Sequence, residues 1–379
     1  MATDTTAKAG LEDIAVASSS ICYLDGERGV LAYRGHDIHD LAEHASFEEV
    51  CHLLWHGHLP SRSELGEVQS QLAAARPLPE GVLRLMRSLP HANSMDTLRT
   101  LTSALSHYDP GANDMSPDGR YRTSVKLTAQ LGTIVATSAR MTAGGGPIDP
   151  DPALSHAANF LYLLKGTRPT ALEARALDVA LVLHADHEFN ASTFAARVAA
   201  ATLTDVHSTI TGAIGALKGP LHGGANTDVM NLLLQIGQDS SDQKIEEVIR
   251  GKLAKKEKIP GFGHRVYRTE DPRATHLRKM SEELGRLSGN LRWFQMSQKI
   301  EQVVKGEKKL NANVDFYSAT TYHALGIPVD LFTPVFAVSR ISGWTAHVLE
   351  QYANNRLIRP RADYTGPSYP QPYVPLDRR

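Results

Sequence analysis

The chain has 379 residues, 42% of them hydrophobic and 21% charged, which is typical of a globular protein with a sizeable core and more than one domain. A formal net charge of -1 argues against any general electrostatic attraction to nucleic acid. No apolar run resembles a signal peptide or reaches the roughly 18 residues of a membrane span, so we expect no membrane partner. The two cysteines, Cys22 and Cys51, lack metal-type spacing and suit a reducing, cytoplasmic location.

The N-terminal part of the chain predicts a loose start over 1–18 and then a small β-hairpin. Two short apolar runs, 21–24 and 30–33, flank the turn-forming residues 25–29. A loop is expected at 144–152, and the tail over 366–379 carries several prolines and should be extended.

Helical signals dominate the rest of the chain. Ser46 with Glu49, and Thr170 with Glu173, have the spacing of capping boxes, and Asp271-Pro272 is a typical helix start. With few strands and no internal repeat, the sequence predicts a mainly α protein. The expected helices begin near 47, 65, 82, 124, 170, 192, 206, 226, 242, 271, 291, 315 and 333.

The stretch 259–273, IPGFGHRVYRTEDPR, combines glycines, a histidine and several arginines. Glycines allow close backbone approach to a ligand, and arginine forks suit carboxylates and phosphates. His264 directly follows Gly263 and can trade protons near neutral pH. The pattern predicts a pocket for a small anion with a proton donor beside it, although a glycine turn before a basic helix gives the same composition.

Two further stretches carry residues of the same chemical kind. His222 lies in KGPLHGGAN (218–226) ahead of an expected helix, and a helix N-terminus favours the neutral imidazole. A neutral imidazole can donate a hydrogen bond to a developing enolate oxygen. Asp315, in NVDFYSA (313–319), sits at another expected helix start. It is either a plain N-terminal carboxylate or a general base.

Several motifs in order along nearly the whole chain resemble those of citrate synthases. They are YRGHDIHDLA (33–42), FEEVCHLLWHGHLP (47–60), GPLHGGAN (219–226), PGFGHRVYRTEDPR (260–273), NVDFYSA (313–319), FTPVFAVSRISGW (332–344) and IRPRADYTGP (358–367). The resemblance implies condensation of acetyl-CoA with oxaloacetate and water to give citrate and CoA. In this pattern Asp315 removes a methyl proton, His222 stabilises the enol, and His264 acts as the acid at the oxaloacetate carbonyl.

The resemblance also implies the substrate contacts. His187, Arg273, Arg340 and Arg359 match residues that hold oxaloacetate, and Arg359 would come from the partner subunit of a homodimer. Arg268 and Lys308 match CoA phosphate contacts, and the backbone of Pro260, Gly261, Phe262 and Gly263 matches the adenine site. A second CoA lysine is in doubt because Gly306 stands at its position, so Lys305 and Lys309 are the alternatives. No cofactor beyond the substrates is expected.

The family pattern further implies a two-domain helical fold. The large domain would take 1–220 and 327–379, and the small domain 221–326, closing on oxaloacetate. The length resembles the family's shorter, dimeric form rather than its longer hexameric form with NADH control. The alternatives are a 2-methylcitrate synthase, which takes propionyl-CoA, and a non-catalytic CoA-binding relative, against which all three catalytic positions argue.

Three other histidines lie close together in the sequence. His52 and His56 have the i,i+4 spacing of a metal pair, with His58 nearby. Because the sequence offers no third ligand at a convincing spacing, we interpret them as surface or packing residues and expect no metal site. The motif GFG (261–263) and the segment 212–218 lack the remaining residues of nucleotide-binding loops.

Overall fold

The computed structural model describes residues 9–11 and 14–379. The expected loose start therefore falls partly outside the described residues, at 1–8 and 12–13. A 3-10 turn, η1, covers Ala9–Leu11. Within the described ranges, no helix combines the length and apolar character needed to cross a membrane.

The expected hairpin is present and belongs to a small antiparallel sheet. Strand β1 (Cys22–Asp25) pairs with β2 (Val30–Tyr33), with Cys22 opposite Tyr33. A third strand, β3 (His36–Asp37), was not predicted, because two residues are too few to show an alternating pattern. The buried Tyr33 hydroxyl donates to the carbonyl of Asp186 at 3.0 Å, which fixes the sheet beside the segment that carries His187.

The prediction of a mainly α fold is confirmed. In chain order the helices are α1 (Ile38–His44), α2 (Phe47–His56), α3 (Arg62–Ala75), α4 (Glu80–Ser88), α5 (Ser94–Leu105), α6 (Pro117–Thr142), α7 (His156–Lys165), α8 (Ala171–His184), α9 (Ala191–Ala200), α10 (Val206–Leu217), α11 (Ala225–Ile236), α12 (Asp242–Ala254), α13 (Pro272–Leu287), α14 (Arg292–Lys308), α15 (Val314–Ala324) and α16 (Phe332–Ala353). Both capping boxes predicted from sequence are formed, at the starts of α2 and α8.

Several helices start earlier than predicted or were not predicted. Helix α6 begins at Pro117, where Ser116 caps it, rather than near residue 124. Helices α1, α5 and α7 were not predicted. Helix α1 is only 7 residues long, so its apolar spacing spans barely two turns and gives a weak periodic signal.

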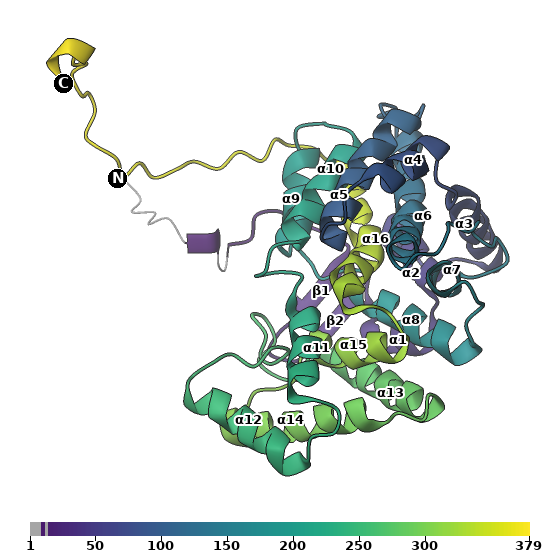
Figure 1. The fold of residues 1–379 in the computed structure, drawn as a ribbon. Helices are drawn as coiled ribbons and strands as arrows, with labels where there is room; N and C mark the ends of the chain where they lie inside the picture. The colour runs from purple at the N-terminus through teal and green to yellow at the C-terminus, as the bar shows by residue number, and fades with distance from the viewer. Residues whose placement is uncertain (1–8, 12–13) are drawn as a thin grey trace.

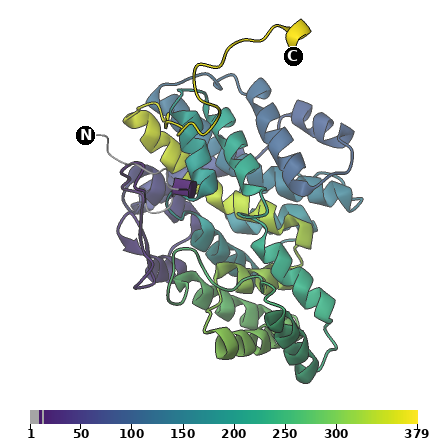
Figure 2. The ribbon, with the colours of Figure 1, turned by 90° about the vertical axis from the view of Figure 1, so that its left-hand side faces the viewer.

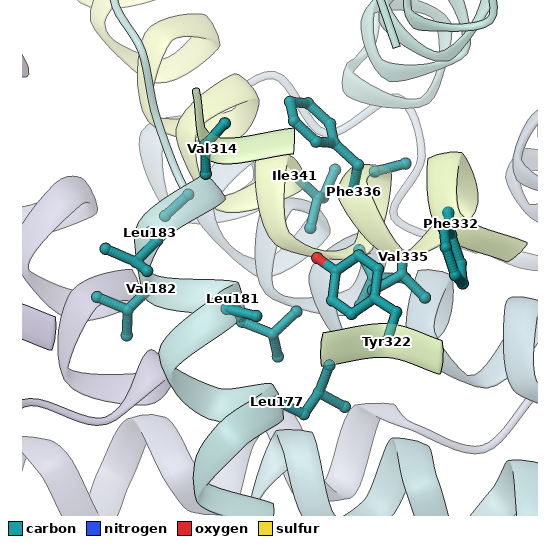
Figure 3. Packing of buried hydrophobic residues seen from close by; sticks show 14 of the residues in the cluster. Leu177, Leu181, Val182, Leu183, Val314, Tyr322, Phe332, Val335, Phe336 and Ile341 are labelled. Carbon is teal, nitrogen blue, oxygen red and sulfur yellow. The ribbon is translucent and has the colours of Figure 1, made fainter. Parts of the chain in front are cut away.

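Helix α16 forms the centre of the molecule. It runs through the middle of the ribbon, with α2, α6, α8, α9 and α10 around it (Figure 1). Most of its residues are buried, as expected for a helix surrounded by others. Figure 3 shows side chains of α16, such as Phe336, packed with Leu181 of α8 and Tyr322 of α15. This core joins α15 and α16, which carry Asp315 and Arg340, to α8, which leads into the loop with His187.

Helices α11 to α15 gather at one end of the molecule, away from α3 to α7 (Figures 1 and 2). Helix α13 packs against α8 and α15, and α11 contacts both α15 and α16. The C-terminal segment after Ala353 leaves the body, runs without regular structure to the 3-10 turn η4 (Leu376–Arg378), and is almost wholly exposed. The expected extended tail is thus present, except for that final turn.

Candidate active site

The loop with the two glycines is tied by its backbone to the start of α15. The Gly263 N–H donates to the Asn311 carbonyl at 3.1 Å, and the Asn313 N–H donates to the Gly261 carbonyl at 2.9 Å. Gly261 has a φ of 79°, and a Cβ there would lie 2.8 Å from the ring of Phe316. Only glycine fits such a position, so the loop can lie directly against α15.

His264 is held by backbone N–H groups of its own loop. Its Nδ1 accepts from the N–H groups of Val266 at 3.0 Å and Tyr267 at 3.1 Å. Because an N–H group can only donate, Nδ1 carries no proton and the neutral ring is protonated at Nε2. Burial, together with the charge of Arg273, lowers the pKa of His264 to about 4. The residue is therefore a neutral imidazole with one N–H left to offer a ligand.

His222 also accepts a hydrogen bond from a backbone N–H, but at Nε2 rather than at Nδ1. The Ser192 N–H donates to its Nε2 at 3.2 Å, which leaves the proton of the neutral ring on Nδ1. The Ser192 hydroxyl lies 2.8 Å from the same Nε2 and accepts from the indole N–H of Trp344 at 3.0 Å. Burial, with the charge of Arg340, lowers the pKa of His222 to about 4. As predicted, His222 lies just before a helix, α11.

Asp315 occupies the first turn of α15, where the sequence placed a helix start. The side chain of Asn313 caps this helix and accepts from the Asp315 N–H at 3.0 Å. Burial raises the pKa of the Asp315 carboxyl to about 6, even though the charges of Arg273 and Arg340 lower it. A carboxyl group with a pKa near 6 is a stronger base than an exposed aspartate and is still ionised at neutral pH.

Arg273 is almost fully buried and paired with Asp271. Its Nε donates to Asp271 Oδ1 at 2.9 Å and its other amino group to Oδ2 at 2.8 Å. Burial alone raises the pKa of Asp271, but the charge and hydrogen bonds of Arg273 outweigh burial and hold that pKa below its usual value. Asp271 Oδ2 also accepts from the Val314 N–H at 3.0 Å, so one carboxylate fixes both the arginine and the start of α15.

Arg340 and His187 are two further predicted oxaloacetate residues. Arg340, on α16, is 1% exposed and donates from Nε to the His184 carbonyl at 2.7 Å. The Nε2 of His187 lies 3.2 Å from the Tyr267 hydroxyl, and its ring centre lies 5.3 Å from that of His264. Burial and the charge of Arg273 keep the pKa of His187 well below its usual value.

The two buried guanidinium groups join residues from distant parts of the chain. The charge of Arg273 acts on the pKa of His264, His187 and Asp315. The charge of Arg340 acts on the same His187 and Asp315, and on His222. Such mutual effects require short separations, so the structure brings together all three predicted catalytic residues and three of the four predicted oxaloacetate residues.

The fourth of these, Arg359, is placed apart from the rest. It lies on the exposed tail that leaves the body after α16 (Figure 2). The Arg268 side chain is exposed too, with its Nε 3.9 Å from a carboxylate oxygen of Glu27. Lys308 ends α14, shortly before Asn311, whose carbonyl pairs with Gly263. Arg268 thus follows the glycine loop in the chain, and Lys308 precedes the segment that pairs with it.

Two residues that organise this site were not identified from the sequence. Asp271 was recognised only as a helix cap, because nothing in sequence spacing shows that its carboxylate also grips Arg273. Ser192 stands 30 residues before His222 in an alanine-rich stretch. Its contact with the imidazole depends on the packing of α9 beside the loop before α11, which sequence periodicity does not report.

The family model described as "Citrate synthase, C-terminal domain" matches residues 10–361. Among curated proteins, "Citrate synthase 2" of Bacillus subtilis is 52% identical over 376 residues, covering 99% of this chain and 100% of that protein. "Citrate synthase" of Haloferax volcanii is 49% identical, covering 98% of this chain and 99% of that protein. "2-methylcitrate synthase" of Shewanella oneidensis is 42% identical, with 98% coverage of each chain.

Solved structures agree with the sequence relatives. The crystal structure of citrate synthase from Pyrobaculum aerophilum superposes with a TM-score of 0.90 at 40% identity, covering 97% of this chain and 94% of that one. The ternary complex of citrate synthase from Thermoplasma acidophilum with carboxymethyl coenzyme A and oxaloacetate gives a TM-score of 0.89 at 31% identity, covering 97% and 98%. Since both sequence and fold match over nearly the full length, this chain belongs to the citrate synthase family.

Proposed function

We propose that this protein is an enzyme that condenses acetyl-CoA with oxaloacetate and water to give citrate and CoA. The observation that carries the proposal is the protonation pattern of the two histidines. His222 keeps its proton on Nδ1 and His264 on Nε2, because backbone N–H groups occupy the opposite nitrogens. Two neutral N–H donors and one buried carboxylate around two arginines suit proton abstraction followed by attack on a ketone.

The reaction begins at the methyl group of acetyl-CoA. The Asp315 carboxylate takes a methyl proton, and the electron pair moves toward the thioester oxygen. The Nδ1–H of His222 donates to that oxygen and stabilises its developing charge. A methyl group next to a thioester is a very weak acid, so base and donor must act together.

Carbon–carbon bond formation follows at the oxaloacetate ketone. The enol carbon attacks the ketone carbon while the Nε2–H of His264 gives its proton to the ketone oxygen. The product is citryl-CoA, whose thioester bond water then hydrolyses to citrate and free CoA. Because its pKa of about 4 keeps His264 neutral at pH 7, this proton leaves the neutral ring, and the proton that Asp315 took from the methyl group would restore it before the next turnover.

Binding the two carboxylates of oxaloacetate requires several guanidinium groups. Arg273 has donors left after pairing with Asp271, and Arg340 after bonding the His184 carbonyl, so both can bind carboxylate oxygens. His187 supplies a further contact. We infer a homodimer in which Arg359 reaches the partner's site, which is supported by its exposed position in the segment after Ala353, where α16 ends.

CoA would bind along the glycine loop. The backbone of 260–263 would take the adenine, and Arg268 and Lys308 the phosphates. For the second lysine we favour Lys305, because it stands three residues before Lys308 and shares its face of α14.

We further infer a large domain, 1–220 with 327–379, and a small domain, 221–326, that closes on oxaloacetate before acetyl-CoA binds.

The acyl specificity separates citrate synthase from the related 2-methylcitrate synthase. We expect kcat/KM for acetyl-CoA to exceed that for propionyl-CoA by roughly 10- to 200-fold. This is the usual range of discrimination in kcat/KM that one methylene group produces in an apolar pocket. The higher identity to relatives named citrate synthase supports this direction. Thiol release from each acyl-CoA with oxaloacetate measures it, and a preference for propionyl-CoA would assign the chain to the other reaction.

The pH profile tests the identity of the base. Only ionised Asp315 can accept a proton, and its pKa of about 6 means that kcat/KM should fall below that pH, by roughly tenfold at pH 5. His222 and His264, with pKa values of about 4, stay neutral between pH 7 and pH 5, so their titration does not contribute to the fall in kcat/KM. Enzyme incubated at pH 5 and assayed at pH 7 serves as the stability control. A profile that stays flat from pH 7 to pH 5 would exclude Asp315 with this pKa as the base.

Finally, we infer a cytoplasmic location. Acetyl-CoA and oxaloacetate are intracellular metabolites, and both Cys22 and Cys51 are free thiols, as expected in a reducing compartment.

A further inference from the structure

A cluster of side chains that could hold a metal ion lies where α2 meets α3, outside the set of predicted catalytic residues. His52 comes from α2, His58 from the connection after it, and Glu64 from the first turn of α3. One donor atom from each of the three lies within 4.8 Å of the other two. Glu64 was not expected as a third ligand, because it stands six residues after His58 and also serves a helix cap.

His52 is held with one nitrogen free of its proton. Its Nδ1 lies 3.1 Å from the His58 carbonyl oxygen. Because a carbonyl can only accept, Nδ1 carries the proton and Nε2 keeps its lone pair. An imidazole that donates one N–H to a backbone carbonyl is the usual arrangement of a metal-binding histidine. The side chain is only 5% exposed, so its orientation is set by packing.

Glu64 divides its two oxygens between a helix cap and the histidines. Its Oε2 accepts from the Ser61 N–H at 2.7 Å, which completes the capping box of α3. Its Oε1 lies 3.2 Å from Nε2 of His58. These two contacts hold the carboxylate in one orientation, with Oε1 toward His58.

A third imidazole, that of His56, borders the group. The ring centre of His56 lies 4.5 Å from that of His52 and 6.5 Å from that of His58. A surface ion pair would account for His58 and Glu64 alone. It would not account for a nearly buried third donor, with another imidazole beside it.

We propose that His52, His58 and Glu64 bind one divalent transition-metal ion of the zinc class. Imidazole nitrogens with a single carboxylate favour zinc, nickel, cobalt or copper over magnesium or calcium, which prefer all-oxygen sites. Three protein ligands leave a fourth position for water or His56. The ion would fasten the connection 57–61 to the buried face of α2 and so stabilise the junction of α2 and α3.

Zinc titration of chelator-treated full-length protein tests the proposal. We expect one site per chain by calorimetry, d–d absorption with cobalt in its place, and a higher melting temperature with zinc than without. Glu64→Gln keeps the capping box, because glutamine also serves at that position, but removes the charged ligand. Glu64→Gln and His58→Gln should each weaken binding at least about tenfold and reduce the zinc-dependent rise in melting temperature.

A matched control is His44→Gln, which removes an exposed histidine whose Nε2 lies 3.9 Å from Glu43 outside any such cluster. It should leave zinc affinity unchanged. In metal-free buffer the two ligand variants should melt within a few degrees of the unaltered protein, which separates ligand loss from misfolding. The proposal is overturned if no saturable site appears at micromolar zinc, or if the double variant of His58 and Glu64 binds zinc as the unaltered protein does.

Discussion

Replacing Asp315 with asparagine is expected to lower kcat by about 10²- to 10⁴-fold, the usual contribution of a positioned general base. Asparagine preserves the size of the side chain and the first turn of α15 but cannot accept a methyl proton. Oxaloacetate binding should survive, because its proposed ligands, Arg273 and Arg340, are untouched. Thiol release under saturating substrates measures the loss, and calorimetry with oxaloacetate alone measures the binding.

Protein stability provides a second readout for the same variant. Burial raises the pKa of the Asp315 carboxyl to about 6, so ionised Asp315 is less favourable in the folded protein than in the unfolded chain. A neutral amide avoids that cost, and the melting temperature of Asp315→Asn at pH 7 should equal or exceed that of the unaltered protein. Asp118→Asn, an exposed aspartate in the first turn of α6, is the matched control and should leave turnover unchanged. Turnover of Asp315→Asn within tenfold of normal would remove Asp315 from the mechanism.

Replacing Asp271 with alanine is expected to lower the free energy of unfolding by about 3–5 kcal/mol, the usual result of breaking a buried ion pair. Arg273 would keep its charge in a site where only 3% of its surface is exposed, without its bidentate partner. The Val314 N–H would lose its acceptor as well. Urea unfolding followed by circular dichroism measures the change.

Two further variants show whether the unpaired charge causes this loss. Asp271→Ala combined with Arg273→Met removes both charges and should recover part of the stability, although not the activity. Glu282→Ala breaks the exposed i,i+4 pair with Arg286 and should cost less than about 1 kcal/mol. If Asp271→Ala proves no more damaging than Glu282→Ala, Asp271 does not hold Arg273 in solution.

The fold was predictable where local signals were strong. Capping boxes at Ser46 and Thr170, and the Asp271-Pro272 start, mark helix ends through contacts between residues close in sequence. Helix α7 was missed despite a side-chain cap at Ser155, because every residue from 156 to 161 is buried and no polar face marks its period. Short strand β3 gave no signal at all.

The candidate catalytic residues could be singled out for a different reason. Glycine-flanked histidines and a helix-start aspartate suggested roles, and the resemblance to a family supplied the pairing between stretches 218–226, 259–273 and 313–319. The sequence did not reveal the residues that hold these side chains in position. The N–H of Ser192 and the carboxylate of Asp271 act across 30 and 43 residues of chain, on His222 and on the Val314 N–H. Such contacts depend on how helices pack and leave no periodic trace.

The backbone pairing of Gly261 and Gly263 with Asn313 and Asn311 has a consequence for building hybrid enzymes. A segment exchanged between relatives to alter the loop 260–263 would have to carry with it the facing segment 311–313 from before α15. If only one segment were transplanted, mismatched hydrogen bonds would shift the imidazole of His264 relative to the carboxylate of Asp315. The two segments should therefore be exchanged together, even though nearly fifty residues of chain separate them.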